Sequence, residues 1–513
     1  MGRHDRRLRA AGGLDPTRAR AARARAGSRD GARVITLHRR LRQLGQTQGD
    51  SPAVITAAQD GSREELSWAD LSDRVLAFAG RMRAAADPGT VVAVPAYRNL
   101  DGVCQVLAAL CAGLIALPYE PSIPSAELER QFSAVRDRLA EPVPAPHLLR
   151  RASGLAADLA PAAGEGGYVL LTGGSTGVPK PVLRAGMPFF HPDKGPSLLL
   201  QTAGWRLGQT HLVVGSLAHA APFNHLLEGT LSGNTLVLPE FFLPGPILEL
   251  IERHHIDWIQ LTPTHMRMLE PALNGRPDAL RRVSGVLHTA APCPADTKRA
   301  WIEAVGPRRL FEMYAATEDI GQTLCRGDEW LAHPGTVGRG FLTRIRIYDD
   351  EGRLLPPGQV GTVHMRGLPG NQSGRGTIRP GRPGRGGFLT VGDHGSLDED
   401  GYLYLSGRSD DLTIVGGENV YTEHVAAVIM SHPGVADAAV VAIPDDVLGA
   451  RLIALVVRAD HEPPTGREVL DHCRDRLASH QLPGEVRMVE DLGRLPNGKL
   501  PREKLRRIGA QPI

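Results

Sequence analysis

The sequence is poor in lysine, in aromatic residues and in paired cysteines. Only five of its 59 basic residues are lysine (Lys180, Lys194, Lys298, Lys499 and Lys504), and aromatic residues make up 4% of the chain. The five cysteines form no Cys-x-x-Cys pair, which argues against a disulfide framework or a zinc site and fits a reducing cytoplasm. A formal net charge of +3 gives no reason to expect binding to nucleic acid.

Long apolar runs are also absent, so the sequence predicts no membrane span, and no signal peptide is visible. Residues 1–34 are rich in Arg, Ala and Gly, which predicts a disordered basic tail. The remaining chain is long enough for more than one domain, and its overall apolar fraction of 42% is sufficient for buried cores. We therefore expect a cytoplasmic protein of at least two domains.

Strand-like and helix-like segments alternate through the first two-thirds of the chain. Ser67 and Asp70 form a helix-capping pattern, and apolar residues follow it at helical spacing. Strand candidates include the β-branched run at 90–94 and the apolar run at 235–238. This alternation predicts an α/β domain with mostly parallel sheets, and after Asp411 the pattern restarts as a smaller α+β unit.

Residues 170–180 (Leu-Leu-Thr-Gly-Gly-Ser-Thr-Gly-Val-Pro-Lys) follow a short apolar stretch and combine glycines, hydroxyls and a lysine. Glycines allow backbone N–H groups to face an anion, so the run predicts a phosphate-binding loop. It is not a Walker loop, because Pro179 replaces its second glycine and Pro181 follows Lys180 where Ser or Thr is required. Alone, such a turn is more often an ordinary loop.

Four further motifs follow in order: Tyr-Ala-Ala-Thr-Glu at 314–318, Val-Gly-Asp at 391–393, Gly-Arg-Ser-Asp-Asp with Gly-Gly-Glu-Asn at 407–419, and Pro-Asn-Gly-Lys at 496–499. Together with the phosphate loop they resemble the adenylate-forming superfamily of acyl-CoA synthetases, peptide-synthetase adenylation domains and luciferases. The resemblance covers essentially everything from about residue 35 onward.

This resemblance implies a large α/β N-terminal domain with mostly parallel sheets and a β-barrel-like subdomain at 35–409. A small mobile α+β C-terminal lid would occupy 410–513, with Asp410 as the hinge. The implied ligands are ATP or AMP, Mg²⁺, coenzyme A and a small-molecule carboxylic acid. A homodimer is one quaternary state that the sequence leaves open.

The resemblance also implies roles for individual residues. Lys499 acts from the lid in adenylation, Thr176 acts on the triphosphate, and Glu318 is both catalytic and the magnesium ligand. The nucleotide and CoA contacts would come from Thr172, Gly173, Ser175, Lys180, Ala290, Ala291, Pro292, Tyr314, Thr317, Asp393, Arg408, Gly416 and Gly417.

A finer resemblance, to bacterial acyl-CoA ligases of the bile-acid-CoA ligase type, is carried by the segments at 288–294 and 330–335. It implies a bulky polycyclic, terpenoid or steroid-like, or aromatic acid. His219, Phe223 and Asn224 would wall the acyl pocket, where neighbouring alanines leave room for rings. Packing alone is an alternative explanation for those alanines.

The motifs also depart from the family pattern. Ala315 and Asp319 replace glycines on either side of Glu318, and His424 replaces a glutamate of the lid helix. These departures raise the hypothesis of an enzyme weakened in adenylation, which converts an acyl-adenylate supplied by a partner ligase. The first hypothesis remains an acyl-CoA ligase; the others are a stand-alone enzyme loading a carrier protein and a non-catalytic nucleotide-binding relative.

Overall fold

The computed structural model describes residues 34–123, 125–151, 166–172, 180–276, 278–316, 318–368, 377–378, 382–383, 385–408, 412–415, 418–445, 448–459, 462–494, 500 and 502–511. Several predicted site residues lie outside these ranges, as do the side chains of Thr172 and Arg408. The predicted site residues that lie wholly outside the described ranges are Gly173, Ser175, Thr176, Thr317, Asp410, Gly416, Gly417 and Lys499.

A nine-stranded sheet forms the centre of the large N-terminal domain, in the order β16-β15-β14-β13-β12-β10-β11-β2-β3. The six strands from β14 to β2 are parallel to their neighbours, whereas β3, β15 and β16 are antiparallel. This confirms the predicted α/β architecture. The bounds are β2 Pro52–Ala57, β3 Arg63–Ser67, β10 Thr210–Val213, β11 Thr235–Pro239, β12 Trp258–Leu261, β13 Gly285–His288, β14 Leu310–Glu312, β15 Thr323–Arg326 and β16 Arg339–Gly340.

A second, six-stranded sheet has the order β19-β8-β7-β5-β4-β6. Its strands β4, β5, β6 and β7 are parallel, and β8 returns antiparallel to β7. Apolar residues of both sheets and of the helices around them form one large buried core. The bounds are β4 Val91–Pro95, β5 Ile115–Tyr119, β6 Val143–Pro144, β7 Gly167–Thr172, β8 Lys180–Ala185 and β19 Thr377–Ile378. Strands β1 Ile35–Thr36 and β9 Phe189–Phe190 pair antiparallel as a separate two-stranded sheet.

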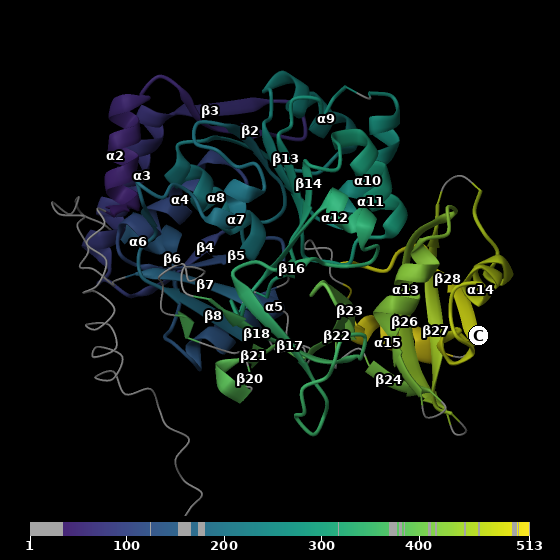
Figure 1. The fold of residues 1–513 in the computed structure, drawn as a ribbon. Helices are drawn as coiled ribbons and strands as arrows, with labels where there is room; N and C mark the ends of the chain where they lie inside the picture. The colour runs from purple at the N-terminus through teal and green to yellow at the C-terminus, as the bar shows by residue number, and fades with distance from the viewer. Residues whose placement is uncertain are drawn as a thin grey trace, which may run out of the picture.

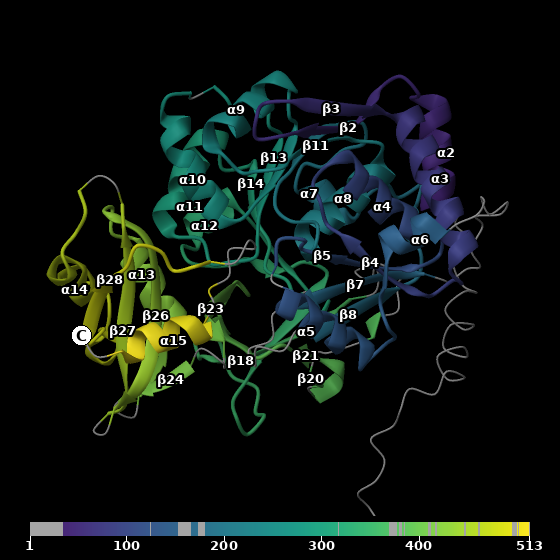
Figure 2. The ribbon, with the colours of Figure 1, turned by 180° about the vertical axis from the view of Figure 1, so that it is seen from behind.

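Helices cover these sheets (Figures 1 and 2). The predicted cap is confirmed, because the Ser67 hydroxyl accepts a hydrogen bond from the Asp70 amide at 3.1 Å and α3 begins at the next residue, Trp68. The bounds are α2 Leu37–Thr47, α3 Trp68–Ala85, α4 Leu100–Cys111, α5 Ser125–Arg136, α6 Ala145–Arg151, α7 Leu198–Thr202, α8 Ala220–Ser232, α9 Pro244–Arg253, α10 Pro263–Asn274, α11 Ala295–Val305 and α12 Gly327–Ala332.

An antiparallel sheet occupies the position predicted for the β-barrel-like subdomain. Its order is β20-β21-β18-β22-β23, and β17 pairs with β18. Ile320, Val363 and Leu403 are buried in its own core. The bounds are β17 Thr343–Tyr348, β18 Gly361–Gly367, β20 Arg382–Pro383, β21 Leu389–Thr390, β22 Asp393–Leu397 and β23 Leu403–Arg408.

The C-terminal unit is α+β, as predicted, and lies beside α10, α11 and α12 in both ribbon views (Figures 1 and 2). A hydrogen bond from Arg267 Nη2 on α10 to the Val435 carbonyl joins it to the large domain at 3.0 Å. Helix α14 ends at Arg474. The bounds are β24 Leu412–Val415, β25 Glu418–Tyr421, α13 Thr422–Met430, β26 Val435–Asp445, β27 Gly449–Arg458, α14 Gly466–Arg474, β28 Glu485–Met488 and α15 Arg502–Ala510.

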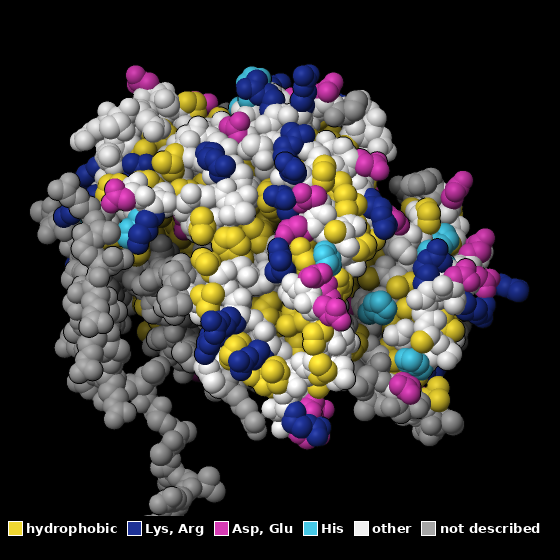
Figure 3. All heavy atoms as spheres, in the orientation of Figure 1, with side chains coloured by type: hydrophobic (Ala, Val, Ile, Leu, Met, Phe, Trp, Pro, Cys, Tyr) yellow, Lys and Arg dark blue, Asp and Glu magenta, His cyan; other side chains and the backbone are white. Residues whose placement is uncertain are grey.

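The surface carries both signs of charge. Basic and acidic side chains are interspersed over the face in Figure 3, in keeping with the small net charge. Among the described helices, none has the length and apolar character required to cross a membrane.

Candidate active site

Several predicted site residues follow the carboxyl ends of strands in the two large sheets. Tyr314 lies just beyond β14, Ala290 just beyond β13, and His219 a short distance beyond β10. Lys180 begins β8 opposite Thr172, the last residue of β7. In open α/β sheets, ligands bind at the carboxyl ends of the strands, so this edge is the expected place for a site.

Tyr314 and Asp393 contact each other across two subdomains. The Tyr314 hydroxyl donates a hydrogen bond to Asp393 Oδ2. Asp393 is 8% exposed and stands opposite Arg408 in the β22–β23 ladder. Asp393 and Arg408 are therefore backbone partners across the two strands. The structure therefore brings together three residues predicted to contact the nucleotide.

The loop at 290–292 is anchored beside Tyr314. The Met313 amide donates to the His288 carbonyl at 3.0 Å, and the Thr289 hydroxyl donates to the Met313 carbonyl at 2.8 Å. Ala290, Ala291 and Pro292 are all exposed, and Ala290 adopts a positive φ of 81°. Their exposure and their place next to Tyr314 suit the predicted wall of an adenine pocket.

Glu318 lies on a loop closed by a bridge between Ala315 and Gln322. Its side chain is half-buried. The next residue, Asp319, has a φ of 56° and forms an ion pair with Arg184 of β8. The loop that carries the predicted magnesium ligand is thus connected to the strand that begins with Lys180.

Beneath these loops, a buried ion pair joins α11 to β14. Lys298 Nζ contacts Glu312 Oε2, and the two side chains are 3% and 7% exposed. Burial, with Lys298 nearby, holds the pKa of His288 well below its usual value, so this ring is neutral. The charge of Lys298 is therefore paired with that of Glu312 inside the protein, so we assign Lys298 a structural role and not a ligand-binding one.

The residues predicted to wall the acyl pocket divide into two groups. His219 is half-buried, and the exposed Asn224 accepts a hydrogen bond from the Tyr168 hydroxyl at 2.9 Å. Phe223 is 0% exposed and belongs to the main core, with its ring centroid 4.7 Å from that of Tyr168. Because α8 turns this ring into the main core, burial gives no support to the expectation that Phe223 contacts the acid, and that role stays a prediction.

Sequence reasoning missed His265 and Arg98 at the same edge. His265 follows β12, stacks on Phe242 with ring centroids 4.3 Å apart, and has its pKa lowered to about 4 by burial and by Arg98. Burial also lowers the pKa of Arg98, although Glu120 and Glu240 oppose that shift. The available signal was position, since both residues closely follow predicted strands.

Comparison with known proteins agrees with this arrangement. The model of the AMP-binding enzyme family matches residues 41–140 and 140–373, and the model of the AMP-binding enzyme C-terminal domain matches residues 424–499. The chain belongs to the AMP-binding enzyme family. The predicted membership of the adenylate-forming superfamily is thereby confirmed.

Individual relatives have different thiol acceptors. The chain is 30% identical over 359 residues to a fatty acid–[acyl-carrier-protein] ligase of Streptomyces coeruleorubidus, a match that spans 66% of each chain and so just under two thirds of that relative. It is 29% identical over 346 residues to 2-succinylbenzoate–CoA ligase of Bacillus subtilis, covering 66% of this chain and 68% of that protein.

A solved structure shares the whole architecture. It is the o-succinylbenzoate CoA synthetase of Bacillus subtilis in complex with its acyl-adenylate intermediate, with a TM-score of 0.74 and 23% identity. The superposition covers 92% of this chain and 98% of that one. At this identity the likeness establishes the fold alone, including the antiparallel subdomain and the small C-terminal domain.

Proposed function

We propose that this enzyme is an AMP-forming acid–CoA ligase. It would join a carboxylate to the α-phosphate of ATP, releasing pyrophosphate, and the thiol of CoA would then displace AMP to give the thioester. A carboxylate is a poor acyl donor because its leaving group would be oxide; adenylation supplies a better one. The observation that carries the proposal is the contact of Tyr314 with Asp393, opposite Arg408, at the strand ends.

The residues of this edge have distinct proposed tasks. Asp393 and Arg408 would bind the ribose diol, for which a carboxylate acceptor and a guanidinium donor are suited. Tyr314 and the exposed loop at 290–292 would flank the adenine. Lys180 would contact the triphosphate together with Thr172, Gly173, Ser175, Thr176 and Thr317.

The metal would be held through a single protein carboxylate. In the described ranges no group of three or more His, Cys, Asp or Glu side chains could hold a metal ion. Mg²⁺ commonly binds through one or two carboxylates and the phosphates of its substrate, and the half-buried Glu318 fits that mode. When bound, the ion would neutralise phosphate charge, while Glu318 would fix its position.

The lid would supply the remaining groups. With a domain boundary after residue 409 and a hinge at Asp410, Lys499 would neutralise the reacting oxygens in one pose. In the other pose Gly416 and Gly417 would line a channel for the pantetheine arm of CoA, since glycines allow a thin ligand to pass close to the backbone.

For the acid, we propose a bulky polycyclic, terpenoid or steroid-like, or aromatic carboxylate. Three features support this: the likeness of segments 288–294 and 330–335 to bile-acid-CoA ligases, the small side chains beside His219, and the exposed Asn224. Neutral His265 and the aromatic Phe242, which stack on each other, would add aromatic surface near Arg98.

Three alternatives remain as competing proposals. A carrier-protein thiol could replace CoA, as the name of the Streptomyces relative suggests for that protein. The enzyme could be weak in adenylation and depend on a partner ligase for its acyl-adenylate. It could also bind a nucleotide without turnover, against which the presence of Lys180, Glu318, Asp393, Arg408 and Lys499 argues.

One experiment separates these functions. Acid-dependent exchange of labelled pyrophosphate into ATP measures adenylation over a panel of aromatic, steroid-like, diterpenoid and fatty acids. Mass spectrometry with CoA or a carrier protein then identifies the acceptor. The ligase proposal requires exchange and an acyl-CoA product. Exchange with no acyl-CoA, but with loaded carrier protein, would replace it with the carrier-protein function.

A further inference from the structure

We infer that Arg184 and Asp319 form a positioning pair that holds the Glu318 loop against the strand of Lys180 and so supports adenylation. This inference rests on the proposed function, because it assigns Glu318 and Lys180 their tasks there. It also gives Asp319, a departure from the family pattern, a supporting role in adenylation and not a damaging one. Asp319 replaces a glycine, which on sequence grounds suggested an interfering negative charge beside the metal ligand.

Arg184 lies on the strand that begins with Lys180. Strand β8 runs from Lys180 to Ala185, and alternate residues of a strand point to the same face. Lys180 and Arg184 therefore share a face, roughly 13 Å apart along the strand at about 3.3 Å per residue. Between them Val182 is fully buried, which fixes the strand in the core. A contact with Arg184 is therefore a contact with the strand that begins with Lys180.

Asp319 lies on the loop closed by the bridge between Ala315 and Gln322. The loop from Ala315 to Gln322 is anchored on one side by Ile320, which is 3% exposed in the core of the antiparallel sheet. On the same side the Gln322 amide donates to the Thr343 hydroxyl at 3.1 Å. The ion pair of Asp319 with Arg184 ties the loop to the second sheet. Glu318 directly precedes Asp319, so it lies on a loop that contacts both the antiparallel sheet and the second sheet.

The backbone of Asp319 explains why the substitution is tolerated. Its φ of 56° lies in the left-handed region, and its amide donates to the Ala316 carbonyl at 2.9 Å to close a turn. Glycine is the usual residue in this conformation, and Asp and Asn are the side chains that tolerate it best. Aspartate thus keeps the turn while adding a carboxylate that glycine lacks.

The two partners of this ion pair differ in exposure. The Arg184 side chain is 14% exposed and that of Asp319 is 36% exposed, so Arg184 is the better shielded partner. The negative charge of Asp319 is therefore matched by a guanidinium and does not stand uncompensated beside Glu318. What remains is a restraint on the loop that a glycine at this position, which has no side chain, could not supply.

The test compares Arg184→Gln, Asp319→Asn, the double variant and Asp319→Gly. Asparagine is the matched change, because it tolerates the left-handed backbone and removes only the charge. We expect each single variant to lower kcat/KM for Mg·ATP in pyrophosphate exchange by about 10-fold to 100-fold, as for residues that orient a metal ligand. The double variant should be no worse than the singles, and Arg184→Lys should recover part of the loss.

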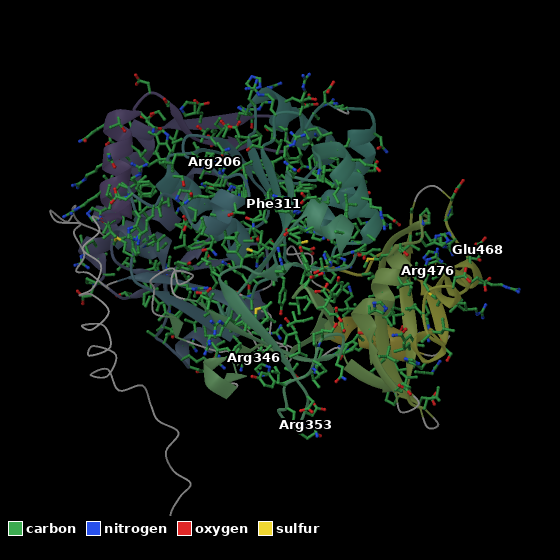
Figure 4. All side chains as sticks on the ribbon, in the orientation of Figure 1. Arg206, Phe311, Arg346, Arg353, Glu468 and Arg476 are labelled. Atoms are coloured by element: carbon green, nitrogen blue, oxygen red, sulfur yellow. The ribbon has the colours of Figure 1, made fainter. Side chains whose placement is uncertain are left out.

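A second readout shows that the effect is specific. Thioester formation from synthetic acyl-adenylate and CoA uses neither the metal nor pyrophosphate, and it should be unchanged. The control is Arg353→Gln, which breaks an exposed ion pair with Asp349 at a distant tip of the antiparallel sheet (Figure 4) and should alter neither reaction. Equal losses in both half-reactions, or Asp319→Gly adenylating faster than the native enzyme, would overturn the inference.

A binding measurement separates this inference from the proposed function. Affinity for Mn²⁺ in the presence of ATP, measured by electron paramagnetic resonance, requires no acid and no turnover. We expect weaker Mn²⁺ binding in Arg184→Gln and Asp319→Asn than in the native enzyme, and unchanged affinities would overturn the inference. If the native enzyme binds Mn²⁺ and ATP, and the variants do so more weakly, yet no acid supports exchange, the ligase function fails and the positioning pair stands.

Discussion

The Tyr314 hydroxyl donates a hydrogen bond to Asp393 Oδ2, although 79 positions separate the two residues in the sequence. Tyr314 follows a parallel strand of the nine-stranded sheet, and Asp393 begins a strand of the antiparallel sheet. One hydrogen bond therefore fixes the orientation of the carboxylate proposed to bind ribose and links the two subdomains that would enclose the nucleotide.

We expect Tyr314→Phe to raise KM for ATP. The variant keeps the aromatic ring and removes only the donor to a buried carboxylate. A hydrogen bond to a charged group contributes about 1.5–3 kcal/mol, which corresponds to roughly 10-fold to 100-fold in affinity. Steady-state kinetics of pyrophosphate exchange would measure it. An unchanged KM would show that the hydroxyl does not position Asp393 for the nucleotide.

The sequence predicted the local features of this fold because they depend on nearby residues. Residue type and spacing predicted the cap at Ser67 and the parallel strands, and the structure confirms both. The ordered motifs predicted the family, which the family match confirms. The pairing of Arg184 with Asp319 depends on how two subdomains pack, so no local pattern predicts it.

The sequence also did not predict the direction of Phe223 on helix α8. The run of alanines around His219 suggested a roomy pocket, but the pattern did not specify which face of α8 would point into the core. The structure places Phe223 in the core and Asn224 at the surface. Adjacent helical positions differ by about 100° in direction, so one residue decides between packing and contact with a ligand.

We expect Ala221→Leu to change the choice of acid, whereas Phe223→Leu should mainly change stability. Ala221 lies near the start of α8, half-buried beside His219, so a larger side chain there should exclude bulky acids before small ones. Phe223→Leu removes buried packing at a cost of roughly 1–3 kcal/mol. Exchange rates over the acid panel, with urea unfolding, would compare them. The assignment fails if Phe223→Leu shifts acid preference as much as Ala221→Leu.

We expect Arg267→Gln to loosen the contact between the large domain and the C-terminal unit. Arg267 Nη2 donates to the Val435 carbonyl at 3.0 Å, across that contact. Without it, limited proteolysis should separate the two parts faster, while ATP affinity should not change because α10 is outside the proposed nucleotide contacts. Arg276→Gln is the matched control, since Arg276 pairs with Glu252 within the large domain. Equal proteolysis rates for the two variants would contradict the prediction.

We expect the protein to lose stability as the pH falls from about 6.5 towards 4. Burial lowers the pKa of His265 to about 4, with Arg98 contributing, and lowers that of His225 to about 3. In this range the unfolded chain takes up protons on these rings and the folded protein does not, so acid favours unfolding. Each ring contributes a loss of about 1.4 kcal/mol per pH unit.

Urea titrations at several pH values would measure this slope. The His265→Gln variant should show a slope shallower by about 1.4 kcal/mol per pH unit, because it removes one of the rings that resist protonation. The control is His255→Asn, at an exposed position with a positive φ that asparagine tolerates. Identical slopes for His265→Gln and the native protein would contradict the assignment of a neutral, buried His265.

We expect Lys499→Ala to reduce adenylation far more than thioester formation from a supplied acyl-adenylate. The reason is the proposed lid, which would present this lysine to the reacting oxygens in one pose only. Loss of a positioned charge that stabilises a transition state costs on the order of 100-fold or more in rate. Lys499→Arg tests the need for a compact ammonium, since arginine spreads its charge over a planar fork. Equal loss in the two half-reactions would mean that Lys499 supports the fold or both poses, and the two-pose mechanism would have to be abandoned for this enzyme.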